Sequence, residues 1–196
     1  MSNNHKKNVL ASVFNKRGFA KLAGKLAGSG FNILATEGTG IELTKNGVTF
    51  TSAEKKSKNP KGLEDCIKTI SFQLEAGILF DHGNPAQVRA VKKLGIVPID
   101  IVICNFPPIE EVVKRPADFN IGNVDVGGPL MVRAAAVNYK NVLVIVDPDD
   151  YGKVGDAIIN NKVTERLRQR LAIKAFHYCA RYDSKIVKYL RSNDLN

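Results

Sequence analysis

Short apolar runs alternate with amphipathic stretches along most of the chain. Four runs are apolar enough for buried strands, at residues 8–14, 31–35, 99–105 and 142–146, and a shorter strand is predicted at 48–51. Helical patterns separate the strands, so each strand returns to the sheet through a right-handed crossover that makes neighbouring strands parallel. The pattern therefore predicts an α/β fold of three layers, with a parallel sheet between helices.

Apolar residues at helical spacing predict the elements between these strands. The clearest helix runs over 19–27, between a turn at 15–18 and a glycine-rich stop signal at 28–30. The tail at 162–190 predicts one or two helices packed on the sheet. The lysine-rich stretch 54–61 has few apolar side chains and predicts a mobile loop. The other predicted helices run from Gly40 to about Asn46, over 86–94 and over 130–136.

The composition is that of an ordinary soluble globular protein, with 44% hydrophobic and 24% charged residues. No apolar run approaches the roughly 18 residues that span a bilayer. The segment 1–8 lacks the apolar core of a secretion signal. We therefore expect a single domain over 1–196, a cytoplasmic location and no membrane partner.

Cysteines, histidines and charge narrow the choice of partners. The three cysteines and three histidines are scattered without metal-ligand spacing, so free thiols and no metal site are expected. The net charge of +10 raises nucleic acid as a partner, but the basic residues are spread out and carry no aromatic RNA-binding signature. A specific nucleic-acid partner is not expected, although non-specific polyanion binding at low salt stays open. A basic surface also attracts phosphorylated metabolites.

Polar groups follow each of the four main predicted strands. Lys16 comes after the first strand, the loop at 36–40 after the second, Asn105 after the third and Asp147 after the fourth. Ligands of open parallel sheets bind in the crevice beyond the carboxyl ends of the strands. These loops are therefore the candidate site.

The loop at 36–40, Thr-Glu-Gly-Thr-Gly, has the properties of a phosphate-binding turn. Its glycines let backbone N–H groups approach an anion, Thr36 and Thr39 add hydroxyl donors, and the helix behind it supplies a favourable dipole. Lys16 would add a positive charge, whereas Glu37 would repel a phosphate unless it points outward. The pattern equally fits a helix-capping turn in which Thr36 or Thr39 is only the N-cap.

Charged residues further along the chain are weaker candidates on their own. They are Lys68, next to Thr69, and Asp125, just ahead of Gly127-Gly128. Isolated lysines and aspartates are usually solvated surface groups, and Asp125 is also placed to cap the following helix. Spacing alone does not make Lys68 and Asp125 partners.

Several segments together resemble a known family. Residues 123–129, Asn-Val-Asp-Val-Gly-Gly-Pro, and 131–140, Met-Val-Arg-Ala-Ala-Ala-Val-Asn-Tyr-Lys, are similar to the block Asp-Ile-Gly-Gly-Pro-x-Met-x-Arg-Ala-Ala-Ala-Lys-Asn-Tyr of the IMP cyclohydrolase domain of purine biosynthesis. Ser-Val-Phe-Asn-Lys-Arg-Gly at 12–18 and Ala-Thr-Glu-Gly-Thr at 35–39 resemble the family's Ser-Val-Ser-Asp-Lys-Thr-Gly and Ser-Thr-Gly-Gly-Thr. The likeness ends where the fused formyltransferase domain of bifunctional members would begin, so that domain is expected to be absent.

The resemblance implies a fold shared with methylglyoxal synthase, a homodimer, and closure of the purine ring of FAICAR, a formylated imidazole carboxamide ribotide, to IMP and water. It implies no metal or organic cofactor. The residues implied to bind the ribotide phosphate are Lys16, Thr36, Gly38 and Thr39. Those implied to lie against the base are Lys68, Thr69, Asn105 and Asp125, and Gly127 is a further residue implied to bind the substrate. Lys68 would stabilise charge developing on the formyl oxygen, and Asp125 would orient the carboxamide.

Several family positions carry residues of different chemistry. Pro107 stands at the tyrosine of the family's Asn-Leu-Tyr-Pro-Phe, and Val137 at the lysine of Ala-Ala-Ala-Lys-Asn-Tyr. The family's Thr-Leu-His-Pro-Lys aligns with residues 69–73, which lack its histidine and lysine. Phe14 replaces a serine and Glu37 a glycine. Each lost donor typically costs about a hundred- to a thousandfold in rate.

Two main hypotheses follow from these departures. The chain is a weak or altered cyclohydrolase acting on a purine ribotide, or a non-catalytic purine-nucleotide-binding or regulatory paralogue. A related lyase or other phospho-ligand enzyme of the same fold and a polyanion binder are further alternatives. Replacing Lys68 or Asp125 with alanine would lower turnover in an enzyme but only affinity in a binder.

Overall fold

A single parallel sheet forms the centre of the molecule. The computed structural model describes residues 6–60, 62, 67, 69–113 and 124–193. Within them, five strands pair in the order β3-β2-β1-β4-β5, all parallel. The strands are β1 (Asn8–Val13), β2 (Asn32–Ala35), β3 (Thr51–Ser52), β4 (Ile101–Asn105) and β5 (Leu143–Ile145).

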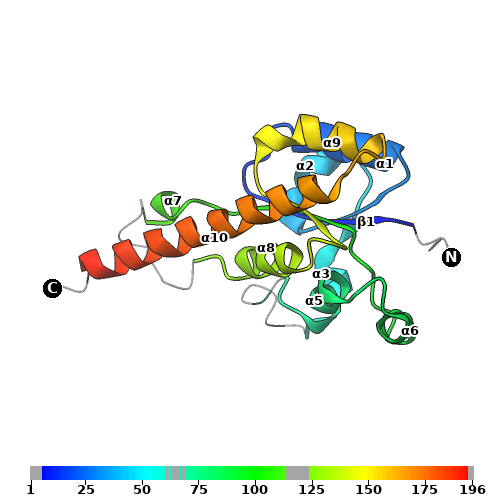
Figure 1. The fold of residues 1–196 in the computed structure, drawn as a ribbon. Helices are drawn as coiled ribbons and strands as arrows, with labels where there is room; N and C mark the ends of the chain where they lie inside the picture. Colours follow the sequence, from blue (N-terminus) through cyan, green and yellow to red (C-terminus); the bar gives the residue numbers. More distant parts are fainter. Residues whose placement is uncertain (1–5, 61, 63–66, 68, 114–123, 194–196) are drawn as a thin grey trace.

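Helices cover both faces of this sheet (Figure 1). One face carries α1 (Phe19–Gly28), α2 (Glu37–Lys45) and α9 (Tyr151–Ile159). The other carries α3 (Ala53–Ser57), α5 (Phe72–Leu79), α8 (Gly127–Val137) and much of α10 (Glu165–Asn193), which also runs beside β5. The connections contain α6 (Pro85–Lys93), α7 (Ile109–Val113) and the 3-10 helix η3 (Pro148–Asp150). This arrangement confirms the predicted three-layer α/β fold; the extent of one domain over 1–196 stays a prediction.

Alternate residues of β1, β2, β4 and β5 enter two separate cores. In β1, Val9 and Ala11 belong to the core beneath α1 and α9, whereas Leu10 belongs to the core beneath α8 and α10. Because both faces are covered, the central strands are apolar at nearly every position, as is usual for buried parallel sheets. That continuity explains why the apolar runs identified the strands.

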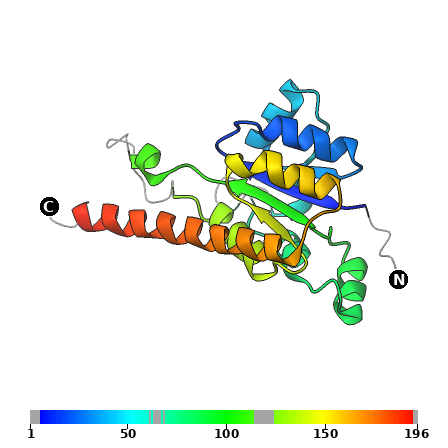
Figure 2. The same ribbon diagram turned by 45° about the horizontal axis from the view of Figure 1, so that its top comes forward.

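The tail forms one long helix rather than two. α10 is 29 residues long, and Figure 2 shows its C-terminal half extending beyond the sheet. Its buried residues recur at helical spacing and pack it against the sheet and α8. They are Leu171, Ala172, Ala175, Cys179 and Tyr182.

Three local predictions are wrong. The expected mobile loop at 54–61 begins within α3, whose N-cap Ser52 accepts a hydrogen bond from the backbone N–H of Lys55. The expected loop at 36–40 forms the first turn of α2 after its N-cap Thr36. The short strand expected at 48–51 lies later, at Thr51–Ser52.

Candidate functional site

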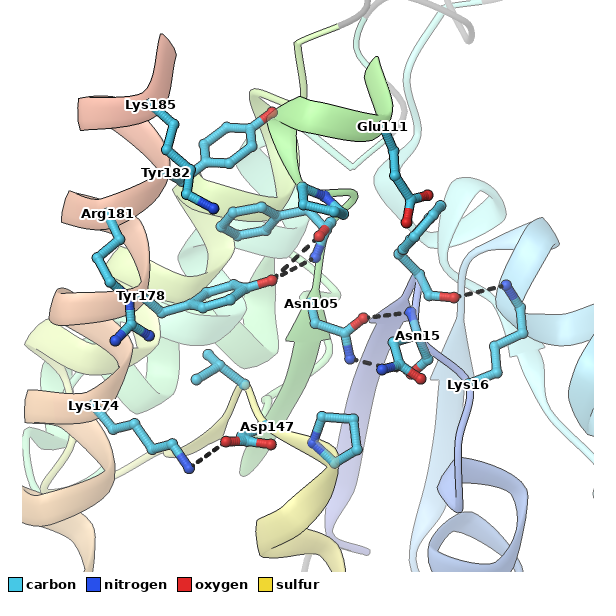
Figure 3. Close-up of a pocket in the computed structure, with 15 residues that line it drawn as sticks. Asn15, Lys16, Asn105, Glu111, Asp147, Lys174, Tyr178, Arg181, Tyr182 and Lys185 are labelled. Atoms are coloured by element: carbon cyan, nitrogen blue, oxygen red, sulfur yellow. Dashed lines mark hydrogen bonds and ion pairs between the residues drawn. The ribbon is translucent and has the colours of Figure 1, made fainter. Parts of the chain in front are cut away.

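A cleft of about 680 Å³ opens at the carboxyl ends of β1, β4 and β5, with α10 as one wall (Figure 3). Lys16, Asn105 and Asp147, which follow these three strands, all line it. The strands end at one edge because their pairings are parallel, so the loops after them meet there. The structure thus brings together three of the four loops expected at this edge.

Asn105 supports the loop that carries Lys16. Its side chain is buried, its Oδ1 accepts a hydrogen bond from the Asn15 N–H at 2.7 Å, and its Nδ2 lies 3.4 Å from the Asn15 oxygen. The same Nδ2 lies 3.3 Å from the hydroxyl of Tyr151. A buried amide gains most when both its donor and its acceptor are paired. Asn105 therefore positions the β1–α1 loop through the Asn15 backbone. Contact between Asn105 and a base stays a prediction.

Lys16 occupies the rim of the cleft. Its Nζ lies 3.4 Å from the carbonyl oxygen of Phe14 (Figure 3). The side chain of Phe14 is 44% exposed and also lines the cleft. An ammonium beside a single carbonyl retains two further donors for an anion. Lys16 is therefore available to a negatively charged ligand.

The loop after β2 is fastened to β1. Thr39 Oγ1 is buried and accepts the Val13 N–H at 2.9 Å, while the Thr36 hydroxyl donates to Thr39 Oγ1 at 3.1 Å. A Cβ placed on Gly38 would have nothing within 4 Å, so the space over this turn is open. The two threonines therefore set the direction in which α2 begins.

Thr69, Asp125 and Gly127 come together at the start of α8. A Cβ on Gly127 would lie only 2.6 Å from Thr69 Oγ1, so a glycine is needed for this approach. Asp125 Oδ1 accepts the Gly128 N–H at 2.8 Å, and the Asp125 N–H donates to the Tyr182 hydroxyl at 3.0 Å. Asp125 thus binds an N–H of the first turn of α8 from one residue before the N-cap position, Val126, which is close to the capping role considered for it. It also lies beside a tyrosine of the cleft wall. Lys68 lies outside the described residues.

Two of the positions that depart from the family pattern, Pro107 and Val137, carry no hydrogen-bond donor on their side chains. Val137 is 66% exposed on α8. Pro107 follows the buried Phe106 just before α7. Neither a valine nor a proline side chain can donate a hydrogen bond or carry charge.

Sequence reasoning missed the contribution of α10. Lys174 Nζ bridges Asp147 Oδ2 at 2.7 Å and Asp150 Oδ2 at 2.6 Å. The hydrogen bond from Lys174 lowers the pKa of Asp147, against a smaller opposing effect of burial.

Tyr178 joins α10 to the end of β4. Its hydroxyl accepts the Phe106 N–H and donates to the Phe106 oxygen, each at 3.2 Å. Burial raises its pKa to about 12, so it remains protonated. Lys174, Tyr178 and Tyr182 follow one another at intervals of four residues, which places them on one face of α10. This spacing is visible in the sequence, but the sequence does not show that this face lines the cleft.

Among the described residues, no group of three or more His, Cys, Asp or Glu side chains is arranged to bind a metal ion. Cys104 and Cys179 are free and buried. None of the described helices is long and apolar enough to cross a membrane.

Known proteins match the chain over almost all of its length. Residues 135–196 match the family model of the AICARFT/IMPCHase bienzyme. The bifunctional purine biosynthesis protein PurH of Caldicellulosiruptor bescii is 38% identical over 189 residues, which are 94% of this chain and 37% of the relative. PurH of Buchnera aphidicola is 40% identical over 192 residues, which are 96% of this chain and 36% of the relative.

A solved structure shares the fold. The crystal structure titled ForH matches with a TM-score of 0.86 and 31% sequence identity, over 93% of this chain and 98% of that chain. The chain thus spans little more than a third of the PurH relatives and nearly all of the ForH chain. By these matches, the chain belongs to the AICARFT/IMPCHase family and corresponds to its IMP cyclohydrolase region.

Proposed function

We propose that the chain is an IMP cyclohydrolase-like enzyme that closes the second ring of FAICAR to give IMP and water. The observation that carries the proposal is the 38% identity to PurH across 94% of the chain. The cleft at the carboxyl edge of the sheet supports it, because ligands of such sheets bind there.

The proposed reaction is intramolecular. The carboxamide nitrogen attacks the formyl carbon, and a carbon–nitrogen bond forms. The carbon–oxygen bond of the formyl group then breaks, and the oxygen leaves as water with one proton from the carboxamide nitrogen and one from the formamide nitrogen. Binding contributes mainly by keeping nitrogen and carbon close, which is worth several kcal/mol, on the order of 7 in well-oriented systems. A donor near the formyl oxygen lowers the barrier further.

The predicted residues divide between the two ends of the substrate. For the phosphate we propose Lys16, Thr36, Gly38 and Thr39. For the base we propose Lys68 at the developing charge, Asp125 at the carboxamide, and Thr69, Asn105 and Gly127 around them. The grouping of Thr69, Asp125 and Gly127 at the start of α8 supports the second set.

A second candidate function is a non-catalytic purine-nucleotide binder. The apolar side chains at Pro107 and Val137 favour it, because two positions that carry donors in the family have none here. Such a protein would bind IMP without turning over FAICAR.

A turnover assay separates the two functions. Purified protein is incubated with FAICAR, and IMP is followed by mass spectrometry against the uncatalysed background. If the chain is an enzyme, IMP forms faster than in the uncatalysed background. Asp125→Asn then lowers this rate about a hundredfold, because the carboxylate acts on the transition state. Asp156→Asn, which removes a surface ion pair with Lys25, is the matched control and leaves the rate unchanged. Binding of IMP with no rate above background identifies the binder.

We also propose that the chain forms a homodimer and acts in the cytoplasm. Large apolar side chains are exposed on α10 as two pairs, each with a spacing of three residues, and eleven residues (about three helical turns) separate the two pairs. This spacing keeps them on one side of the helix and supports a helix–helix contact. They are Ile173, Phe176, Val187 and Leu190, named here the α10 stripe. The purine biosynthesis proteins that the chain resembles support the location.

A further inference from the structure

The N-terminal end of α2 already interacts with a carboxylate of the same chain. Glu54 Oε1 accepts the backbone N–H of Glu37 at 3.0 Å. Glu54 Oε2 accepts the Ser52 hydroxyl at 2.9 Å, which fixes the orientation of the carboxylate. Glu54 therefore occupies a donor of the turn proposed to bind the ribotide phosphate.

The sheet register brings Glu54 to this place. β2 and β3 are parallel neighbours, and Ala35 pairs with Ser52. Both strands end at the same edge, so α2 after β2 and α3 after β3 begin side by side. Glu54 is the second residue of α3, and its side chain reaches across to the first residue of α2.

A carboxylate at this position competes with a phosphate. The backbone N–H groups of a first helical turn are the donors that bind anions, and the helix dipole favours one negative group there. A phosphate that takes the Glu37 N–H would lie against the Glu54 oxygen, and like charges at that distance repel. Open space over Gly38 leaves room for a ligand, but the adjoining donor is in use.

We propose that Glu54 is a specificity-determining residue that acts as an internal competitor for the phosphate of the ribotide. The ligand phosphate gains the Glu37 N–H only when the Glu54 carboxylate leaves it, so Glu54 weakens binding of the nucleotide and not of the nucleoside. This inference rests on the proposed function, because it takes the phosphate of that substrate as the competing group.

Calorimetric titrations with IMP and with inosine test the inference. Glu54→Ala frees the N–H and is expected to tighten IMP binding about tenfold, the difference typical of a hydrogen bond to a charged group. Glu54→Gln keeps an acceptor for the N–H but removes the charge, and is expected to give a smaller gain. Inosine affinity stays the same in all variants. Glu42→Ala, on the same helix, removes one negative charge elsewhere and serves as the matched control.

The outcomes separate this inference from the proposed function. Equal IMP affinity in the wild type, Glu54→Ala and Glu54→Gln overturns the competitor role and leaves the proposed function standing. An equal gain in Glu42→Ala also overturns it, because net charge would then explain the effect. Absence of IMP binding in every variant, together with no turnover of FAICAR, overturns both. Glu54→Gln keeps the capping interaction, so its result counts even if Glu54→Ala loses the start of α2.

Discussion

At the scale of single residues, Glu75 on α5 is held in surroundings that disfavour its charge. Among the described residues, neither of its carboxylate oxygens has a hydrogen-bond partner, and both are buried. Burial raises its pKa from the ordinary 4.5 to about 7. The folded chain therefore binds more protons than the unfolded chain between these values, and the free energy of unfolding falls as pH rises through that window.

Glu75→Gln is expected to stabilise the protein above neutral pH, by about 1–2 kcal/mol after allowance for partial exposure. Below pH 4.5, where the carboxyl is protonated in both states, the variant and the wild type should unfold alike. Urea denaturation at a series of pH values measures this difference, with Glu165→Gln on the start of α10 as the control. A gain that is independent of pH would contradict the explanation.

The close approach of Gly127 to Thr69 leads to a second prediction for a single residue. Gly127→Ala would place a methyl group within 2.6 Å of Thr69 Oγ1, so Thr69 must move. A displacement near 1 Å in a site costs about a hundredfold in rate, and we expect that loss in FAICAR turnover. The control is Gly152→Ala on α9, where the added carbon meets nothing within 4 Å. Equal rates in both variants would show that Thr69 is remote from the chemistry.

Sequence patterns predicted which residues lie near the site better than they predicted the contacts that those residues make. They indicated that Lys16 and Asn105 lie at one sheet edge, and the structure places both on the same cleft. They did not show that the Asn105 amide is hydrogen-bonded to the Asn15 backbone, or that the Glu54 carboxylate accepts an N–H of α2. Such interactions depend on how strands that are distant in the sequence align in the sheet, and the spacing of residues within one segment does not give that alignment.

At the scale of elements, α10 is tied to the ends of β4 and β5. Tyr178→Phe removes both hydrogen bonds to the Phe106 backbone and leaves a partly buried N–H without this partner. The expected loss is about 1–3 kcal/mol of unfolding free energy, measured by urea denaturation. FAICAR turnover should fall less than in Asp125→Asn, since Tyr178 acts through the backbone. No loss of stability would mean that packing alone holds α10 here.

The elements themselves were predicted unevenly. Strands buried on both faces are continuous apolar runs, so their pattern is strong. α9 was missed because Gly152 and Gly155 weaken its helical signal, yet Gly155 lets the helix approach Leu22 of α1. α3 was missed because its lysines suggested a solvated loop, whereas Ala53 anchors it in the core. In both segments tertiary packing stabilises a helix that local propensity does not predict.

At the scale of the whole molecule, the α10 stripe predicts self-association. Val187→Glu is expected to shift the mass measured by light scattering after gel filtration from dimer to monomer, because a charge buried in an apolar contact is costly. Thr44→Glu introduces the same charge on α2, away from the stripe, and should leave the mass unchanged. A monomeric wild type at every protein concentration would contradict the homodimer.

The central place of β1 has a consequence for synthesis on the ribosome. β1 pairs with β2, which soon follows it in the chain, and with β4, whose Ile101 meets Val9. Until β4 emerges, a nascent chain carries β1 with one row of N–H and C=O groups unmatched, and such edges recruit other strands. Chains arrested before residue 101 should therefore bind chaperones and aggregate, while chains arrested after β5 should resist proteolysis.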